Sequence, residues 1–218
     1  MNKDTVFIIG GGESVKENNL LHLENQDVIA VNRAYFDLPI TAKYFVTMDY
    51  SFVTKYIDRQ EYNRLKNSSV TKIFIIPFDV DYIKEKDGKI VDIRFPLIYD
   101  LSLFNIIIKS PLKEPIHFNW SNFCNGHNSG YCALQLAALL GYRTINLIGI
   151  DLTFKGQTHF HNKYNTNKNT FKKKLDEYYK VWEKGIFRLW EEGYEINSYS
   201  SISRLNNITG VSYKGKIY

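Results

Sequence analysis

Short apolar segments recur along this 218-residue chain, and each ends at a glycine or a polar residue. Their length and their β-branched residues predict buried strands, and the spacing of apolar residues between them predicts helices. Strands that alternate with helices pair in parallel through right-handed crossovers. The sequence therefore predicts an α/β, Rossmann-like fold, with a mostly parallel central sheet and helices on both faces. The expected strands are 5–9, 27–31, 43–48, 71–77, 144–150 and 194–197.

Helix signals stand between these strands. Ser14 and Glu17 have the spacing of a capping box, with leucines at 20, 21 and 23 behind them. Further helices are expected at 50–65, at 129–140 and at 171–192. The helix at 129–140 is apolar on all sides, which predicts burial, and Gly141 ends it. In the last helix the aromatic residues indicate packing; they are Tyr178, Tyr179, Trp182 and Trp190.

One domain spanning 1–218 is expected, with an insertion at about 79–120. Within it, KEKDGKIVDIRF alternates around Asp87-Gly88, which is typical of a hairpin, and the segment is interpreted as a small lid-like region.

Composition excludes several classes of protein. No segment reaches the roughly 18 apolar residues of a membrane span, and the apolar start is too short for a secretion signal. Two cysteines outside any CxxC pair make no disulfide framework. The net charge of +5 is dispersed, so nucleic-acid binding has only the total charge in its favour. A cytoplasmic protein without a transmembrane segment is expected.

The residues that follow the strands are the first candidates for a site, because ligands of open α/β sheets bind outside the carboxyl ends of the strands. They include Asn32, Asp49 and the turn Gly10-Gly11-Gly12, which leads toward Ser14. Backbone N–H groups at such a turn favour phosphate, although the glycines could also serve only a tight turn. The dinucleotide fingerprint fails, because Val15 stands at its third glycine and Asn32 at its acidic position. No P-loop motif occurs.

A second polar turn, Asn125-Gly126-His127-Asn128-Ser129-Gly130, precedes the buried helix and suits phosphate or sugar oxygens, unless Ser129 is only an N-cap. Asp151 follows a central strand. There it would accept hydrogen bonds from ribose hydroxyls, or coordinate a metal, or only cap a loop. His159 and His161 would point the same way in an extended segment, and one of them is a candidate for proton transfer. A zinc site there lacks clear third and fourth ligands.

The ordered motifs resemble a known superfamily. They are VFIIGGGESV, VNRAYF, NSGYCALQLAALLGYRTINLIGIDLTF, GQTHFH and YEINSYSSISRL, between about residues 5 and 205. The set is similar to the Rossmann-like superfamily of bacterial CMP-sialic acid-dependent sialyltransferases, motility accessory factor glycosyltransferases and the archaeal 6-hydroxymethylpterin diphosphokinase. Small phage-type members share the G-x-N-S-G, G-x-D and G-x-x-H-x-H series.

The resemblance implies roles for individual residues. Gly11 and Glu13 replace an asparagine and a proline of the sialyltransferase G-N-G-P-S turn, and Asn32 and Asp49 fall on donor-site asparagines. Asn128-Ser129-Gly130 matches the donor-contacting T-S-G, and Gly149-Ile150-Asp151 matches the G-I-D at the cytidine. Thr153 stands where that family has a phosphate-binding tyrosine. The general-base histidine falls on His161 or His159.

Three functional hypotheses follow. The first is a metal-independent glycosyltransferase that takes a nucleotide-activated sugar, a CMP-sugar by resemblance, and transfers it to a hydroxyl of a glycan or small acceptor. The second is a pyrophosphokinase that uses ATP and Mg²⁺, with Asp49 and Asp151 at the metal. The third is a non-catalytic nucleotide-binding protein. A homo-oligomer that completes the acceptor side is a further expectation.

Overall fold

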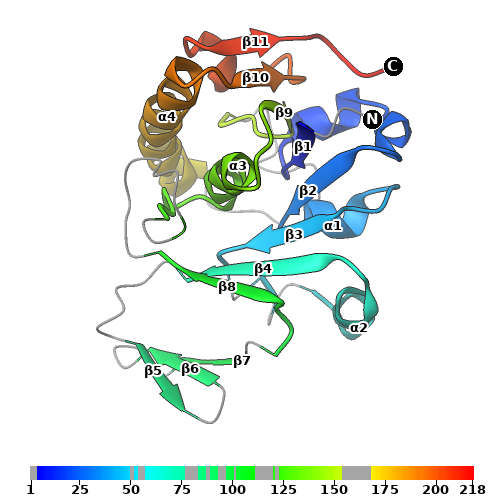
Figure 1. Ribbon diagram of the computed structural model, residues 1–218, viewed down its shortest axis with the longest axis vertical. Helices are drawn as coiled ribbons and strands as arrows, with labels where there is room; N and C mark the ends of the chain where they lie inside the picture. Colours follow the sequence, from blue (N-terminus) through cyan, green and yellow to red (C-terminus); the bar gives the residue numbers. More distant parts are fainter. Residues whose placement is uncertain are drawn as a thin grey trace.

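The computed structural model describes residues 4–49, 52–53, 57–76, 83–86, 89–92, 97–100, 102–110, 120, 123–153 and 168–218. Within this part of the chain, an eight-stranded sheet has the order β11-β10-β9-β1-β2-β3-β4-β8, and every neighbouring pair is parallel (Figure 1). The predicted α/β, Rossmann-like architecture is confirmed. The strands are β1 (Thr5–Ile9), β2 (Asp27–Val31), β3 (Tyr44–Thr47), β4 (Thr71–Ile76), β8 (Ile106–Lys109), β9 (Thr144–Ile148), β10 (Glu195–Ser198) and β11 (Val211–Tyr213).

The strand order reverses beside β1. The chain adds β2, β3 and β4 on one side of β1, and then returns to add β9, β10 and β11 on the other side. Connections before and after such a reversal leave the sheet in opposite directions, which opens a crevice at the carboxyl ends of the strands. The topology therefore places the crevice next to the ends of β1 and β9.

Helices cover both faces of the sheet, as predicted (Figure 1). On one face lie α3 (Ser129–Leu139) and α4 (Lys168–Glu191), and their side chains share a core with residues such as Ile8. The other face carries η1 (Glu13–Glu17), η2 (Leu20–Leu23), α1 (Ala34–Asp37) and α2 (Arg59–Asn67), which pack with residues such as Ile9. Successive side chains of β1 thus point to opposite cores, so continuous apolar runs mark strands covered on both sides.

Helix α3 is buried on every side, which confirms the sequence-based expectation. Its residues from Ser129 to Ala138 are all buried between the sheet and α4. Tyr131 of α3 meets Trp182 of α4 edge-on at 5.8 Å between ring centroids. Gly141 follows the helix with a φ of +90°, the left-handed conformation expected of a C-terminal glycine.

The capping box predicted at Ser14 and Glu17 is wrong. Residues 13–23 form the two short 3-10 helices η1 and η2, and no side chain caps η1. The Ser14 hydroxyl donates instead to the carboxylate of Asp151, 137 residues away in the chain. A long-range partner therefore overrides the local signal. The helix expected from residue 50 begins at Arg59, after the capping box of Asp58 and Glu61.

The hairpin around Asp87-Gly88 is confirmed, since β5 (Ile83–Lys86) and β6 (Lys89–Asp92) pair antiparallel. A further strand, β7 (Leu97–Asp100), completes a small separate sheet. Not all of the expected insertion leaves the main sheet, however, because β8 returns to pair with β4. Strand β11, at the other edge, had no sequence-based prediction.

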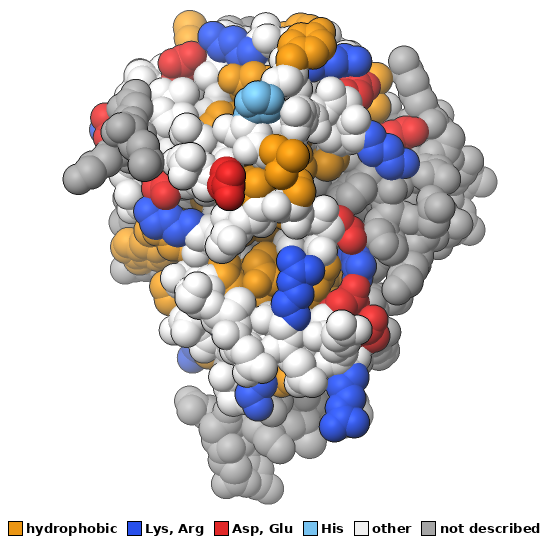
Figure 2. All heavy atoms as spheres, turned by 90° about the vertical axis from the view of Figure 1, so that its right-hand side faces the viewer, with side chains coloured by type: hydrophobic (Ala, Val, Ile, Leu, Met, Phe, Trp, Pro, Cys, Tyr) orange, Lys and Arg blue, Asp and Glu red, His pale blue; other side chains and the backbone are white. Residues whose placement is uncertain are grey.

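Charged side chains of both signs are interspersed on the face that carries η1, α1 and α2 (Figure 2). This distribution agrees with the expectation of a dispersed net charge. Among the described residues, no helix combines the length and the apolar character needed to cross a bilayer.

Candidate nucleotide-binding site

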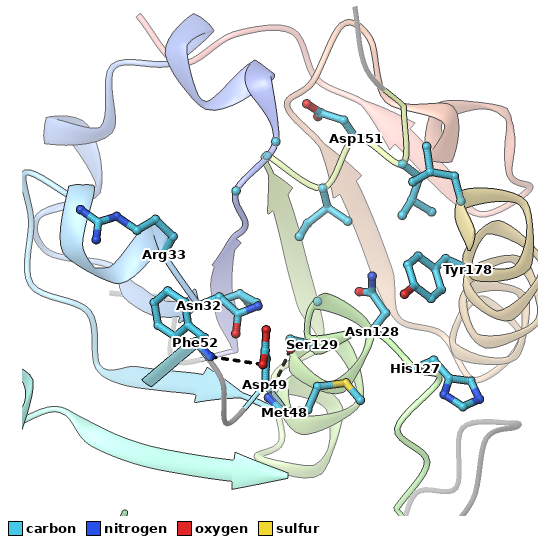
Figure 3. A pocket seen from close by; sticks show the side chains of 18 of the residues that line it. Asn32, Arg33, Met48, Asp49, Phe52, His127, Asn128, Ser129, Asp151 and Tyr178 are labelled. Carbon is cyan, nitrogen blue, oxygen red and sulfur yellow. Dashed lines mark hydrogen bonds between the residues drawn. The ribbon is translucent and has the colours of Figure 1, made fainter. Parts of the chain in front are cut away.

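A pocket of about 440 Å³ lies at the carboxyl edge of the sheet (Figure 3). Residues that follow β1, β2, β3 and β9 line it, together with the start of α3 and one face of α4. The fold thus brings together segments that are more than a hundred residues apart in the chain. The predicted donor-site residues on its wall are Gly11, Gly12, Asn32, Asp49, Asn128, Ser129, Gly130, Gly149, Asp151 and Thr153.

The start of α3 presents free donors to the pocket. Asn128 is the N-cap, and its side-chain oxygen accepts a hydrogen bond from the Tyr131 amide at 3.0 Å. The Ser129 hydroxyl accepts a bond from the Met48 amide at 3.2 Å, which ties the end of β3 to the helix. No hydrogen bond joins the N–H of Ser129 or Gly130 to another described residue. These two N–H groups and the helix dipole favour an anionic ligand.

Asn32 and Asp49 reach the pocket from the ends of β2 and β3 (Figure 3). Asn32 has a φ of +51°, and its amide donates to the Val46 carbonyl at 3.1 Å. Its side-chain Oδ1 is buried, and no described residue donates to it. A buried polar atom without a partner is costly, so Asn32 is suited to a polar ligand group. Asp49 accepts the Phe52 amide at 3.2 Å and so orders its own turn.

Gly10 and Ser14 lie behind the pocket and are absent from its wall. The Gly10 amide bonds to the Ile148 carbonyl at 2.8 Å, and a Cβ at Gly10 would lie 2.6 Å from the Gly149 oxygen. Gly10 therefore allows β1 and the end of β9 to approach closely. Ser14 is fully buried and donates to Asp151 through both its amide and its hydroxyl.

Several residues on the pocket wall were not predicted as site residues. Arg33 directly follows Asn32, and His127 lies inside the predicted polar turn without having been chosen as a site residue, so proximity to the candidates was a usable signal. Tyr178 was assigned to helix packing, but it is only partly buried and points its hydroxyl toward Asn128 (Figure 3). Helical spacing identifies the inner face of α4, and it does not show that one turn of that face borders a pocket. Trp190, also assigned to packing, is 47% exposed.

Arg33 is held by two carboxylates at one side of the pocket. Its guanidinium lies 2.6 Å from Glu61 and 3.2 Å from Asp37, and it packs over the Phe36 ring at 5.5 Å. Burial alone would lower the pKa of Arg33, but the hydrogen bonds with Glu61 and Asp37 raise it overall. Burial likewise opposes ionisation of Glu61, yet the Arg33 bond lowers the pKa of that carboxyl. Arg33 and Glu61 therefore stay charged, and the contacts of Arg33 with Glu61 and Asp37 fix the segment that follows Asn32.

We expect Glu61→Gln to lower the free energy of unfolding by about 2 kcal/mol, because it breaks a charged hydrogen bond in a largely buried pair. The depressed pKa of Glu61 means that its stabilisation is complete above the unfolded value of about 4.5 and disappears as pH falls through the folded value. Urea unfolding between pH 3 and 7 tests both points, with the pH values chosen to bracket that range. A variant as stable as the wild type at pH 7 would contradict the prediction.

The two predicted catalytic histidines, His159 and His161, lie outside the described residues. So do Phe154, Phe160 and Tyr164, the aromatic residues near them that the sequence suggests for stacking on a substrate. Within the described part of the chain, no group of three or more His, Cys, Asp or Glu side chains is arranged to hold a metal ion. Asp49 and Asp151 lie at opposite ends of the pocket in Figure 3.

Cys132, expected in the core, is fully buried in α3, and burial raises the pKa of its thiol.

Fold and site together define a Rossmann-like α/β protein with a pocket at the switch point of its sheet. No protein-family model and no curated protein sequence matches the chain. Several solved structures do match the chain. One is the sialyltransferase CstII from Campylobacter jejuni, in complex with the substrate analogue CMP-3FNeuAc. It is 17% identical, and the match covers 95% of this chain and 86% of CstII with a TM-score of 0.58.

The monofunctional alpha-2,3-sialyltransferase Cst-I from Campylobacter jejuni is 19% identical, with a TM-score of 0.61 over 97% of this chain and 81% of its own. Another CST-II structure, with a trisaccharide acceptor and CMP, is 19% identical over 95% of this chain and 85% of that chain, with a TM-score of 0.58. At this level of identity the likeness establishes the fold. It covers nearly the whole chain.

Proposed function

We propose that the chain is a glycosyltransferase that binds a nucleotide-activated sugar, specifically a CMP-sugar, in the pocket. The observation that carries the proposal is the start of α3, where Ser129 and Gly130 offer two backbone N–H groups to the pocket. The unpartnered Oδ1 of Asn32 faces the same space. Support also comes from the likeness in fold to sialyltransferases solved with CMP and a CMP-sugar analogue.

In this proposal the phosphate of the donor lies at the start of α3, where the N–H groups of Ser129 and Gly130 stabilise the charge that develops on the leaving CMP. Asn32 and Asp49 contact the polar groups of the donor from the carboxyl ends of β2 and β3. His161, or alternatively His159, removes the proton from the acceptor hydroxyl as it attacks the anomeric carbon. The products are the glycosylated acceptor and CMP, and no metal ion takes part.

Nucleotide titration tests the proposal directly. We expect CMP to bind and to raise the melting temperature, with UDP and ATP weaker, because a ligand that binds only the folded state stabilises it. Isothermal calorimetry with CMP, CDP, UDP and ATP gives the affinities, and mass spectrometry of the purified protein identifies a nucleotide that copurifies. If none of the four binds, the donor proposal is wrong.

Chelation separates the glycosyltransferase from the pyrophosphokinase hypothesis. Transfer from a CMP-sugar should continue in EDTA, whereas ATP-dependent pyrophosphate transfer should stop because it needs Mg²⁺. The kinase hypothesis requires Asp49 and Asp151 to serve one metal site. Their separation in Figure 3 and the hydrogen bonds that Asp151 receives from Ser14 and Ser200 weigh against it.

A further inference from the structure

The carboxylate of Asp151 lies directly against the first glycine turn. A Cβ on Gly12 would lie 2.5 Å from Oδ2 of Asp151 and 2.6 Å from the Gly149 carbonyl oxygen. Side chains do not approach each other so closely, so the turn admits this carboxylate only because residue 12 is glycine. The turn near which the sequence predicts a phosphate therefore lies, at Gly12 and Ser14, against a negative group of the chain itself.

Three protein donors satisfy this carboxylate. The Ser14 amide donates to Oδ2 at 3.0 Å, the Ser14 hydroxyl donates to Oδ1 at 2.5 Å, and the Ser200 hydroxyl donates to Oδ1 at 2.7 Å. Asp151 is 3% exposed, and both serines are almost wholly buried. A buried carboxylate is tolerated when such hydrogen bonds replace its hydration. The donors are therefore already committed to Asp151.

The three segments that meet here come from distant parts of the chain. Ser14 belongs to η1 after β1, Asp151 follows β9, and Ser200 follows β10. The Gly12 amide also donates to the Gly149 carbonyl at 2.8 Å. This backbone hydrogen bond fixes the glycine turn against Gly149, and both line the pocket. Losing the carboxylate would leave the Ser14 and Ser200 hydroxyls buried without a partner and would remove the side-chain link among these segments.

We infer that Asp151 is a positioning residue whose carboxylate permanently occupies the hydrogen-bond donors of Ser14 and Ser200 beside the first glycine turn. It holds the turn, the end of β9 and the segment after β10 in register around the pocket. As a consequence, which rests on the proposed function, the phosphate of the donor is bound at the start of α3 and not at Gly10-Gly11-Gly12.

Chemical rescue tests this role. Asp151→Ala removes the carboxylate and leaves a hole of its size, so we expect the melting temperature to fall by about 10 °C. Sodium formate, which has the size of the missing group, should recover part of that loss, and larger acetate should recover less. Sodium chloride at equal ionic strength should recover none. Formate should leave the wild-type melting temperature unchanged, because the site is already filled.

Asp27→Ala is the matched control. The Asp27 carboxylate also accepts hydrogen bonds, from Lys43 at 2.7 Å and from Tyr142 at 2.6 Å, but its side chain is one-third exposed and the site is open to water. This variant should lose stability without responding to formate. Equal responses of both alanine variants and the wild type would overturn the inference, since they would show a general salt effect.

A second measurement covers the case in which Asp151→Ala does not fold. Asp151→Asn keeps the shape of the side chain, and its stability can be compared with those of Ser200→Ala and of the double variant. Residues that share one network lose less together than the sum of their separate losses, and we expect that non-additivity here. Strict additivity would overturn the inference. Neither experiment uses a nucleotide, so its failure is distinct from a failure of CMP to bind.

Discussion

Replacing Asn128 by aspartate should weaken CMP binding at least tenfold while the chain stays folded. Aspartate is as good an N-cap as asparagine, so it keeps the bond from the Tyr131 amide, and its charge suits the helix N-terminus. In the pocket, however, a carboxylate at roughly 6 Å from the phosphate adds about 2–3 kcal/mol of repulsion at an effective dielectric constant near 20. Calorimetric titration with CMP measures the loss.

Two comparisons make the Asn128→Asp result specific. Cytidine has no phosphate, so its affinity should change little. Asn19→Asp makes the same chemical change at the N-cap of η2, on the surface, and should leave both affinities unchanged. An equal loss of affinity for cytidine and CMP would place the phosphate away from α3 and would contradict the proposed binding mode.

Gly149→Ala should be the most destabilising of the glycine substitutions around the pocket, with a loss of about 3 kcal/mol or more in the free energy of unfolding. Gly149 has a φ of +67°, and an added Cβ would collide with Val15 Cγ2 and lie 2.7 Å from the Gly10 oxygen. The backbone contact cannot yield without moving β1 against β9. Because Gly149 also accepts the Gly12 amide, CMP affinity should fall as well.

Gly193→Ala is the matched control for Gly149→Ala. Gly193 has a similar φ of +80°, but a Cβ added there would meet no heavy atom within 4 Å. The free energy of unfolding of the Gly193→Ala variant should therefore fall by only about 1 kcal/mol, which is the cost of the left-handed conformation for a residue with a Cβ. Urea unfolding gives the free energy of unfolding of each variant, and the difference between the two values measures the cost of the steric overlap at Gly149. Equal losses would show that close packing at Gly149 is unimportant.

Local patterns predicted the strands and the buried helix well. Apolar runs as short as DVIAV become strands covered on both faces, and the Asn128 to Gly141 segment begins and ends where its cap and glycine indicate. Strands β8 and β11 were missed. They are edge strands, and β8 has exposed residues at three of its four positions, so it lacks the continuous burial that marks the central strands.

The candidate site was predictable in its members more than in their roles. Strand-end logic placed Asn32, Asp49 and Asp151 on one pocket wall, because parallel strands end at the same edge of a sheet. Tyr178 escaped prediction, since the helical period of α4 does not show where its inner face leaves the core. His159 and His161 remain predictions.

The sequence by itself determined the central strands, the buried helix, the carboxyl edge as the place of the site, and many residues on the pocket wall, because these follow from local periodicity and from the geometry of parallel sheets. Only the tertiary structure decided what each polar group does there. Ser14 had the spacing of a helix cap, and Asp151 had the strand-end position of a ligand contact. In the structure the two residues are hydrogen-bonded to each other. The reason is physical: a hydrogen bond across 137 residues depends on the packing of β1 against β9, which no local pattern encodes.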